Sequence, residues 1–405
     1  MGDPNAPLPP YAKDSVRDSL WASRADEAAR SVNRMFGHRV CFLPGTHLAA
    51  VQRPSGRLPS PSKPWHYWWQ AHYLDCLVDT GRRELTQKRP FDGDGRPSAG
   101  KLASRLVTGI RLRNLLTFVN SYYDDMAWLA LAAQRLQKLA EETRRVRRRR
   151  NERALKALEL QFDSASTHHL GGGTFWNTTR DFKNTPATAP VALFYARNGN
   201  TVKAQELLDW LAARLLDPAK GLYLDGLRIR PDGSEELVGA VYTYNQGPVL
   251  GALLEVGGVP NLKRAAALIE AVDRELARPA HTGGGKDLRV LRGEGTGDGG
   301  LFTGILTRYL ALAAVDPRLP ASSRTIASQL VTDTAGSLWE GRRLIAAGEP
   351  LARYGGRMIF SLNPDIPATV TYPPGAAVEL STQLQSWMIL EAAATLEDAV
   401  SSTHC

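Results

Sequence analysis

Apolar residues recur every three or four positions along most of this chain, a spacing that constrains its fold more than any other feature. The first such stripe, within residues 15–36, consists of Trp21, Ala25, Ala28, Val32 and Met35. The same spacing predicts further helices over residues 65–80, 101–118, 124 onward, 144–162, 188–197, 201–216, 244–255, 260–277, 304–315, 321–335 and 382–396. Alternation typical of strands occurs only in short pieces such as residues 222–230. The chain is therefore expected to be all-α.

The segments between these helices are rich in glycine, proline and asparagine, and the long ones also carry tryptophan, tyrosine and aspartate. They comprise residues 89–99, 168–186, 257–260, 281–300 and 354–375. No single linker divides the chain into two halves of different composition. We therefore predict paired helices closed into one α/α barrel over residues 15–400, with its loops and its site at one mouth. Residues 1–14 would form an N-terminal extension, and a two-domain helical bundle is the alternative.

Composition limits the location of the protein. No apolar run reaches the roughly 18 residues that a membrane helix needs. The first residues lack a basic segment followed by an apolar one, so no secretory signal is visible. The three cysteines, Cys41, Cys76 and Cys405, are odd in number and have no metal-ligand spacing, which favours reduced thiols. These features predict a cytoplasmic protein.

A large part of the net charge of +9 lies in one run, Arg144–Arg153. Elsewhere acidic and basic residues nearly balance. No aromatic residue interrupts the run to stack on bases, so we expect no nucleic-acid partner. The simplest interpretation is a solvated helix end, and peripheral contact with an anionic surface is the alternative.

Two adjacent aspartates, Asp124 and Asp125, stand between tyrosines and a tryptophan at the start of a predicted helix. Adjacent carboxylates repel each other, and burying one unpaired is costly, so the pair does not stabilise a fold. At a helix start, free N–H groups help to keep one carboxylate ionised, whereas burial and like charge raise the pKa of the other. Such a split suits acid catalysis at a sugar acetal. The structural alternative is a helix cap beside an exposed aspartate.

Three further segments combine aromatic faces with polar groups that suit carbohydrate hydroxyls. They are WHYWWQAHY at residues 65–73, GGGTFWN at 171–177 followed by FKNTP at 182–186, and YTYNQGP at 242–248. Taken singly, each also fits a core helix, a tight turn or a capped helix start. Other chemistries are excluded by spacing: the glycine-rich segments lack the Walker pattern, and His168 and His169 are too close for a helical zinc pair.

These motifs, in this order, resemble those of glycoside hydrolase family 76. The resemblance rests on YYDDMAWLALA at residues 122–132, KNTP at 183–186, YTYNQG at 242–247 and FTGILTRYL at 302–310, and it spans roughly residues 65–396. It implies an (α/α)6 barrel that cleaves α-1,6-mannosidic bonds in mannan or mannosylated glycoconjugates. It further implies retention of configuration and no metal. We also expect no other cofactor, and a monomer.

The resemblance also assigns roles to residues. Asp124 matches the nucleophile and Asp125 the acid/base. The expected substrate-binding residues are Trp68, Trp69, Tyr123, Trp176, Asn177, Lys183, Asn184, Asp225, Tyr244, Asn245 and Gln246.

The chain departs from the family pattern in three ways. Many relatives are exported, whereas no secretory signal is visible in this sequence. The lysine motif continues here as Thr185–Thr188 instead of Ala-Ile-Ser, and the arginine run stands where relatives have a shorter charged turn. Two other functions stay open at this stage. One is another α/α-barrel sugar enzyme, such as an epimerase that uses His168 and His169, and the other is a non-catalytic module that binds glycan or anionic lipid.

Overall fold

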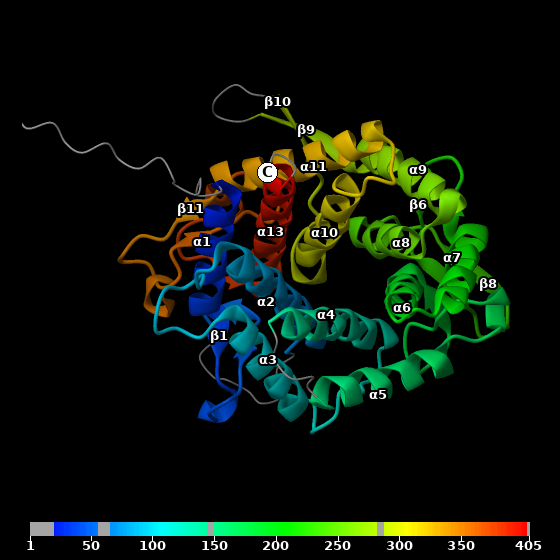
Figure 1. The fold of residues 1–405 in the computed structure, drawn as a ribbon, viewed down its shortest axis with the longest axis horizontal. Coiled ribbons are helices and arrows are strands. Elements are labelled where there is room, and N and C mark those ends of the chain that lie inside the picture. The colour runs from blue at the N-terminus through cyan, green and yellow to red at the C-terminus, as the bar shows by residue number, and fades with distance from the viewer. Residues whose placement is uncertain (1–19, 56–64, 144–148, 282–286, 403–405) are drawn as a thin grey trace, which may run out of the picture.

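The computed structural model describes residues 20–55, 65–143, 149–281 and 287–402. Six helices form a closed inner ring, each in contact with the next and the last with the first (Figure 1). They are α2 (Tyr67–Gln87), α4 (Tyr123–Glu142), α6 (Thr185–Arg197), α8 (Thr243–Val256), α10 (Phe302–Ala314) and α13 (Leu380–Ser402).

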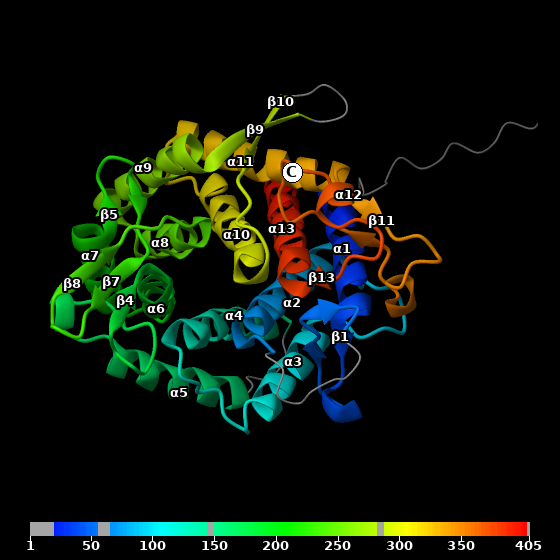
Figure 2. The same cartoon turned by 180° about the vertical axis from the view of Figure 1, so that it is seen from behind.

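Six outer helices alternate with the inner ones along the chain and surround the ring (Figure 2). They are α1 (Leu20–Phe36), α3 (Ala99–Arg113), α5 (Arg149–Ala165), α7 (Thr201–Leu215), α9 (Gly258–Leu276) and α11 (Ala321–Glu340). Each outer helix returns the chain to the end at which the next inner helix begins. All inner helices therefore start at one end of the barrel, the N-terminal face, and finish at the other, the C-terminal face. This arrangement is an (α/α)6 barrel, as predicted.

Sequence pattern explains which helices lie inside. In α6 every residue from Thr185 to Ala196 is buried, because an inner helix contacts both its ring neighbours and an outer helix. In α9, by contrast, only one stripe is buried, formed by Asn261, Ala265, Leu268, Ile269, Ala271, Val272 and Leu276. The outer helices thus keep the amphipathic spacing that made them recognisable in the sequence.

Short strands connect the helices. A three-stranded sheet joins β4 (Phe182–Asn184), β7 (Gly226–Ile229) and β8 (Glu235–Val238), and β9 (Ala277–His281) pairs with β10 (Asp287–Leu291). The other strands are β1 (Gly37–His38), β2 (Leu48–Ala49), β3 (Gln52–Arg53), β5 (Leu216–Asp217), β6 (Leu222–Tyr223), β11 (Arg343–Leu344), β12 (Met358–Ile359) and β13 (Val378–Glu379). Single helical turns occur at Val40–Phe42, His169–Gly171, Gly297–Leu301, Ala352–Tyr354 and α12 (Ala368–Thr371).

Each of the twelve predicted helices has a counterpart among the described residues, and only the boundaries differ. The predicted helix over residues 101–118 ends at Arg113, because Leu115 and Leu116 adopt positive φ angles that cannot continue a helix. The segment 281–300, predicted to be a loop, contributes strand β10 and a helical turn. The predicted extension over residues 1–14 and the first half of the arginine run, residues 144–148, lie outside the described residues.

No helix in the described ranges combines the length and the apolarity that crossing a membrane would require.

Candidate active site

The two aspartates occupy the first turn of α4 at the N-terminal face. Tyr122 precedes the helix in an extended conformation, and the backbone here pairs with the segment that carries Trp176. The Tyr123 N–H donates to the Trp176 carbonyl at 2.8 Å, and the Thr178 N–H donates to the Ser121 carbonyl at 3.0 Å. This short pairing fixes the tryptophan beside the start of α4.

Fixed donors hold each carboxylate. Asp124 accepts from the Trp176 indole Nε1 at 2.9 Å and from the Asp125 backbone N–H at 2.9 Å. Asp125 accepts from the Asn120 Nδ2 at 2.8 Å, and Asn120 is itself oriented by the Tyr122 N–H. Both aspartates keep part of their surface open to solvent. A substrate can therefore reach carboxylates whose orientation is already set.

Burial raises the pKa of both aspartates. For Asp124, the loss of hydration and then the charge of Asp125 hold the pKa well above its usual range. For Asp125, the loss of hydration raises the pKa to about 7, and the Asn120 amide opposes the shift. Neighbouring carboxyls of this kind release their protons one after the other. The pair therefore keeps its protons to higher pH than isolated aspartates do, and loses them in two separate steps.

A third carboxylate, Asp298, faces this pair from the turn that precedes α10. Its Oδ1 accepts from the indole groups of Trp68 and Trp69 at 3.0 and 2.8 Å. Its side chain is largely exposed, and its charge contributes to the raised pKa of Asp125. Asp298 is not among the predicted site residues, because its glycine-rich segment, residues 295–300, carries no local motif that points to a sugar site. The neighbouring tryptophans Trp68 and Trp69 indicate that an acceptor lies close to them. Asp298 is about 230 residues away in the sequence, so the sequence could not identify it as that acceptor.

An aromatic cluster surrounds the carboxylates. Tyr244 stacks on Phe302 with ring centroids 3.8 Å apart, and Trp68 lies 6.4 Å from Tyr244. Burial raises the pKa of Tyr244 well above its ordinary value, with further contributions from the charges of Asp225 and Asp124. Asp225 itself is buried enough to raise its pKa to about 6. The N-terminal face thus combines acidic groups with ring faces, a chemistry that suits sugars.

The structure divides the predicted substrate-binding residues into two groups. The residues with open surface near the aspartate pair are Trp68, Trp176, Asn177, Asp225 and Tyr244. The fully buried residues are Trp69, Tyr123, Lys183, Asn184, Asn245 and Gln246. Because the second group has little or no accessible surface, we expect these residues to support the site rather than to contact substrate, and direct binding stays a prediction. Several of these instead hold the site together: Asn184 caps α6, and Gln246 binds the backbone of Tyr223.

Lys183 shows why a polar residue in a sugar-enzyme motif can be structural. Its Nζ lies within 2.6–3.0 Å of five acceptors, namely the carbonyls of Thr167, His169, Gly172 and Gly173 and the Thr167 hydroxyl. Gly172 and Gly173 of this loop pack closely against Trp210. A Cβ on Gly173 would lie 2.6 Å from that ring. The lysine and the glycines together pack the loop that leads to Trp176.

Replacing Lys183 by methionine should lower the free energy of unfolding by about 3 kcal/mol, because several buried acceptors lose the donor that binds them. The loop before Trp176 should loosen as well. Chemical denaturation and hydrogen exchange over residues 167–175 would measure both effects. The exposed Lys263 on α9 provides a matched control, since Lys263→Met removes the same charge without leaving acceptors unpaired. Equal stability of the two variants would contradict this structural role.

Within the described residues, no group of three or more histidine, cysteine or acidic side chains is placed to hold a metal ion.

Comparison with known families decides the classification. The model of glycosyl hydrolase family 76 matches residues 45–341, which is most of the chain. The chain belongs to glycosyl hydrolase family 76. It is therefore a glycoside hydrolase, as the sequence motifs predicted. Comparison with curated protein sequences gives no match.

Solved structures of family members superpose along most of the chain. The α-1,6-mannanase GH76A of Salegentibacter sp. HEL1_6 is 27% identical, with a TM-score of 0.72, and the match covers 93% of this chain and 99% of that one. An inactive variant of the same enzyme, with two consecutive aspartates changed to asparagine, is in complex with α-1,6-mannotriose and gives a TM-score of 0.73. Lin0763 of Listeria innocua, at 23% identity, shares the fold with a TM-score of 0.73 over 93% of this chain and 97% of that one.

Proposed function

We propose that the protein hydrolyses α-1,6-mannosidic bonds with retention of configuration, with Asp124 as nucleophile and Asp125 as acid/base. The observation that carries the proposal is the pair itself. Two carboxyl groups whose pKa values are raised by burial lie side by side at one helix start, and separate donors orient each of them. A retaining glycosidase needs one ionised and one protonated carboxyl beside the scissile bond.

The donors support this division of roles. Both oxygens of Asp124 accept N–H groups, from Trp176 and from the Asp125 backbone, and such donors favour the ionised form that attacks an anomeric carbon. Asp125 accepts one amide N–H, which leaves its other oxygen free to carry the proton. In the first step Asp124 would bond to the anomeric carbon while Asp125 protonates the departing oxygen. In the second step Asp125 would take a proton from water, and the resulting hydroxide would displace Asp124.

The substrate class rests on the relatives. The Salegentibacter mannanase, at 27% identity, is bound to α-1,6-mannotriose and to α-1,6-mannotetrose in variants whose two consecutive aspartates are replaced. We extend this to a mannan or mannosylated glycoconjugate as the substrate here. Trp68, Trp176 and Tyr244 would offer ring faces to the sugars, and Asn177 and Asp225 would bind hydroxyls. His168 and His169, the alternative pair for an epimerase, are exposed on the loop that Lys183 anchors.

Incubation with α-1,6-mannooligosaccharides of defined length tests the proposal. We expect shorter mannooligosaccharides as products, and the first product observed by proton NMR should have the α configuration. The size distribution would distinguish internal cleavage from release of terminal mannose. A β-configured first product would contradict retention, and no cleavage of any α-1,6-mannoside would contradict the substrate class.

The pH profile provides a separate prediction, on Asn120. Its amide favours the ionised form of Asp125, so Asn120→Ala should raise the pKa of Asp125 above the wild-type value of about 7. Activity falls at high pH when the acid loses its proton, so this fall should move to higher pH. Loss of orientation should also lower kcat roughly ten- to a hundredfold. Asn200→Ala, which removes only a cap of α7, should leave the profile unchanged. An unshifted alkaline limb in the Asn120 variant would argue against Asp125 as the acid.

A further inference from the structure

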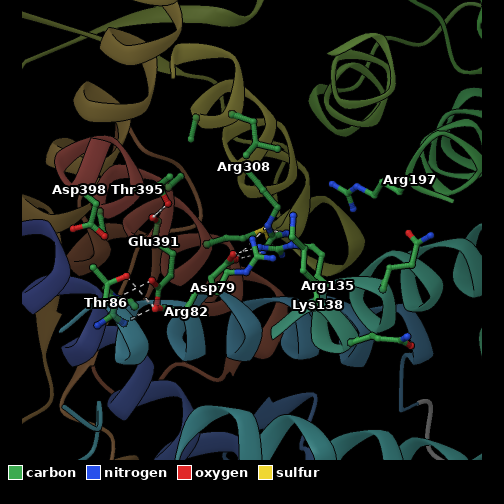
Figure 3. Close-up of a pocket in the computed structure, with 18 of the residues that line it drawn as sticks. Asp79, Arg82, Thr86, Arg135, Lys138, Arg197, Arg308, Glu391, Thr395 and Asp398 are labelled. Carbon is green, nitrogen blue, oxygen red and sulfur yellow. Dashed lines mark hydrogen bonds and ion pairs between the residues drawn. The ribbon is translucent and has the colours of Figure 1, made fainter. Parts of the chain in front are cut away.

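A cavity of about 650 Å³ opens at the C-terminal face, at the far end of the inner helices from the aspartate pair (Figure 3). Arg135 in its wall lies eleven residues beyond Asp124 on α4, which corresponds to about 16 Å along the helix. The cavity is therefore separate from the candidate active site. Charged side chains of both signs line it: the cations Arg82, Arg83, Arg135, Lys138, Arg197 and Arg308, and the acids Asp79, Glu141, Glu255, Glu391 and Asp398.

Three of these cations are neutralised by buried carboxylates. Arg308 binds Asp79 at 2.8 Å and Asp75 at 3.2 Å, and Arg135 contacts the same two aspartates. Arg83 binds Glu391 at 2.8 Å and also contacts Asp26. These ion pairs join α2, α4, α10 and α13 and account for Arg83, Arg135 and Arg308 as parts of the fold.

The other three cations are not neutralised in this way. The carboxylate nearest Arg82 is Glu142 at 3.7 Å, and both of these side chains are more than one-third exposed. Arg197 and Lys138 form no ion pair with any carboxylate of the described residues. The Nε of Arg82 and the Nη1 of Arg197 are buried and find no acceptor in that part of the chain. Buried donors without acceptors are rare in folded proteins, and they indicate a missing partner.

The ends of the helices offer a competing explanation. Six inner helices finish at this face, and their free carbonyls carry partial negative charge, which favours nearby arginines and lysines. That explanation accounts for exposed guanidinium groups, but not for two buried N–H groups that find no acceptor among the described residues. It also does not explain why Arg82 and Arg197 lie close enough to repel each other. Burial lowers the pKa of Arg82, and the charges of Arg135 and Arg197 lower it further.

We propose that this cavity binds a phosphate-type oxyanion among Arg82, Lys138 and Arg197. In Figure 3 these side chains reach into the same space from α2, α4 and α6, which are neighbours in the ring. Guanidinium groups bind such oxyanions through two parallel N–H donors, and Lys138 adds a mobile charge at the rim.

The rest of the cavity favours an ester over free phosphate. Its volume falls in the range of small-molecule sites and exceeds what inorganic phosphate would fill. The side-chain amides of Gln134 and Gln137 also line the cavity. They can accept hydroxyl groups, so a phosphorylated polyol or sugar would use both the cations and the amides.

Calorimetric titration of the full chain at constant ionic strength tests the proposal. The probes are inorganic phosphate, glucose 6-phosphate and unphosphorylated glucose, with chloride as the background anion. We expect glucose 6-phosphate to bind more tightly than phosphate, and glucose not to bind. Co-sedimentation with vesicles that contain phosphatidylglycerol would show whether a lipid headgroup supplies the phosphate. In that case the protein should sediment with the vesicles, and glucose 6-phosphate should abolish this binding.

The variant Arg82→Gln/Arg197→Gln should weaken binding of glucose 6-phosphate at least tenfold. The control Arg230→Gln/Arg274→Gln removes the same charge from exposed positions and should bind as the wild type does. If the double variant does not fold, Arg197→Gln alone decides the matter, because that guanidinium has no ion pair to lose among the described residues. Equal binding by cavity and control variants, or no difference between phosphate and chloride, would overturn the proposal.

Discussion

Asp124→Asn should abolish hydrolysis of α-1,6-mannooligosaccharides, lowering kcat by roughly four to six orders of magnitude. Removing a nucleophile from a covalent mechanism costs this much, because water must then attack without the enzyme-bound intermediate. The amide keeps the shape of the carboxylate and its hydrogen bond to the Trp176 indole, so folding should be intact. Thermal unfolding followed by circular dichroism, together with product analysis, measures both properties.

The effect of this substitution on stability has a definite sign. Burial raises the pKa of Asp124 in the folded protein, so its ionised form destabilises the fold at neutral pH relative to acidic pH. Asp124→Asn removes that cost, and its melting temperature should equal or exceed that of the wild type. Asp232→Asn, at an exposed turn, is the matched control and should retain full activity. Turnover by the Asp124 variant at the wild-type rate would exclude Asp124 as nucleophile.

The helices could be predicted from the sequence because their signal is local. Outer helices such as α1 and α9 show an amphipathic stripe, and the apolar inner helices are bounded by glycine, proline and asparagine. Local signals could not locate helix ends that depend on distant contacts. Asn184 is both the last residue of β4 and the N-cap of α6. The start of α6 therefore depends on the pairing of β4 with β7, which lies about forty residues further along the chain.

The candidate site could be predicted in part, for a related reason. Asp124 and Asp125 are adjacent, so their mutual repulsion can be inferred from the sequence alone. The sequence alone cannot show which polar residues face substrate, because their exposure depends on how the loops pack. Lys183 and Trp176 belong to the same motif region, yet one is buried among carbonyls and the other binds Asp124 at the surface. Asp298 joins the site through two indole groups some 230 residues away, as their hydrogen bonds show.

Asp125→Ala should lower kcat on mannooligosaccharides about 10²- to 10⁴-fold, the usual contribution of a general acid/base. The loss should depend on the leaving group. A mannoside with an acidic phenol as leaving group needs little protonation, so formation of the glycosyl-enzyme should be nearly normal. Hydrolysis of the glycosyl-enzyme still lacks a base and should be slow. A burst of phenol followed by slow turnover is therefore expected in stopped-flow measurements.

The configuration of the product formed with azide distinguishes the roles of the two aspartates more clearly than rate measurements do. In Asp125→Ala, azide needs no base and should attack the intermediate on Asp124, which restores turnover and yields α-mannosyl azide with retained configuration. A variant that lacks the nucleophile, Asp124→Ala, could accept azide only directly at the anomeric carbon, which yields the β product. The two variants thus predict opposite product configurations from neighbouring positions on α4. Retained product from Asp124→Ala would reverse the assignment, and inverted product from Asp125→Ala would exclude a covalent intermediate on Asp124.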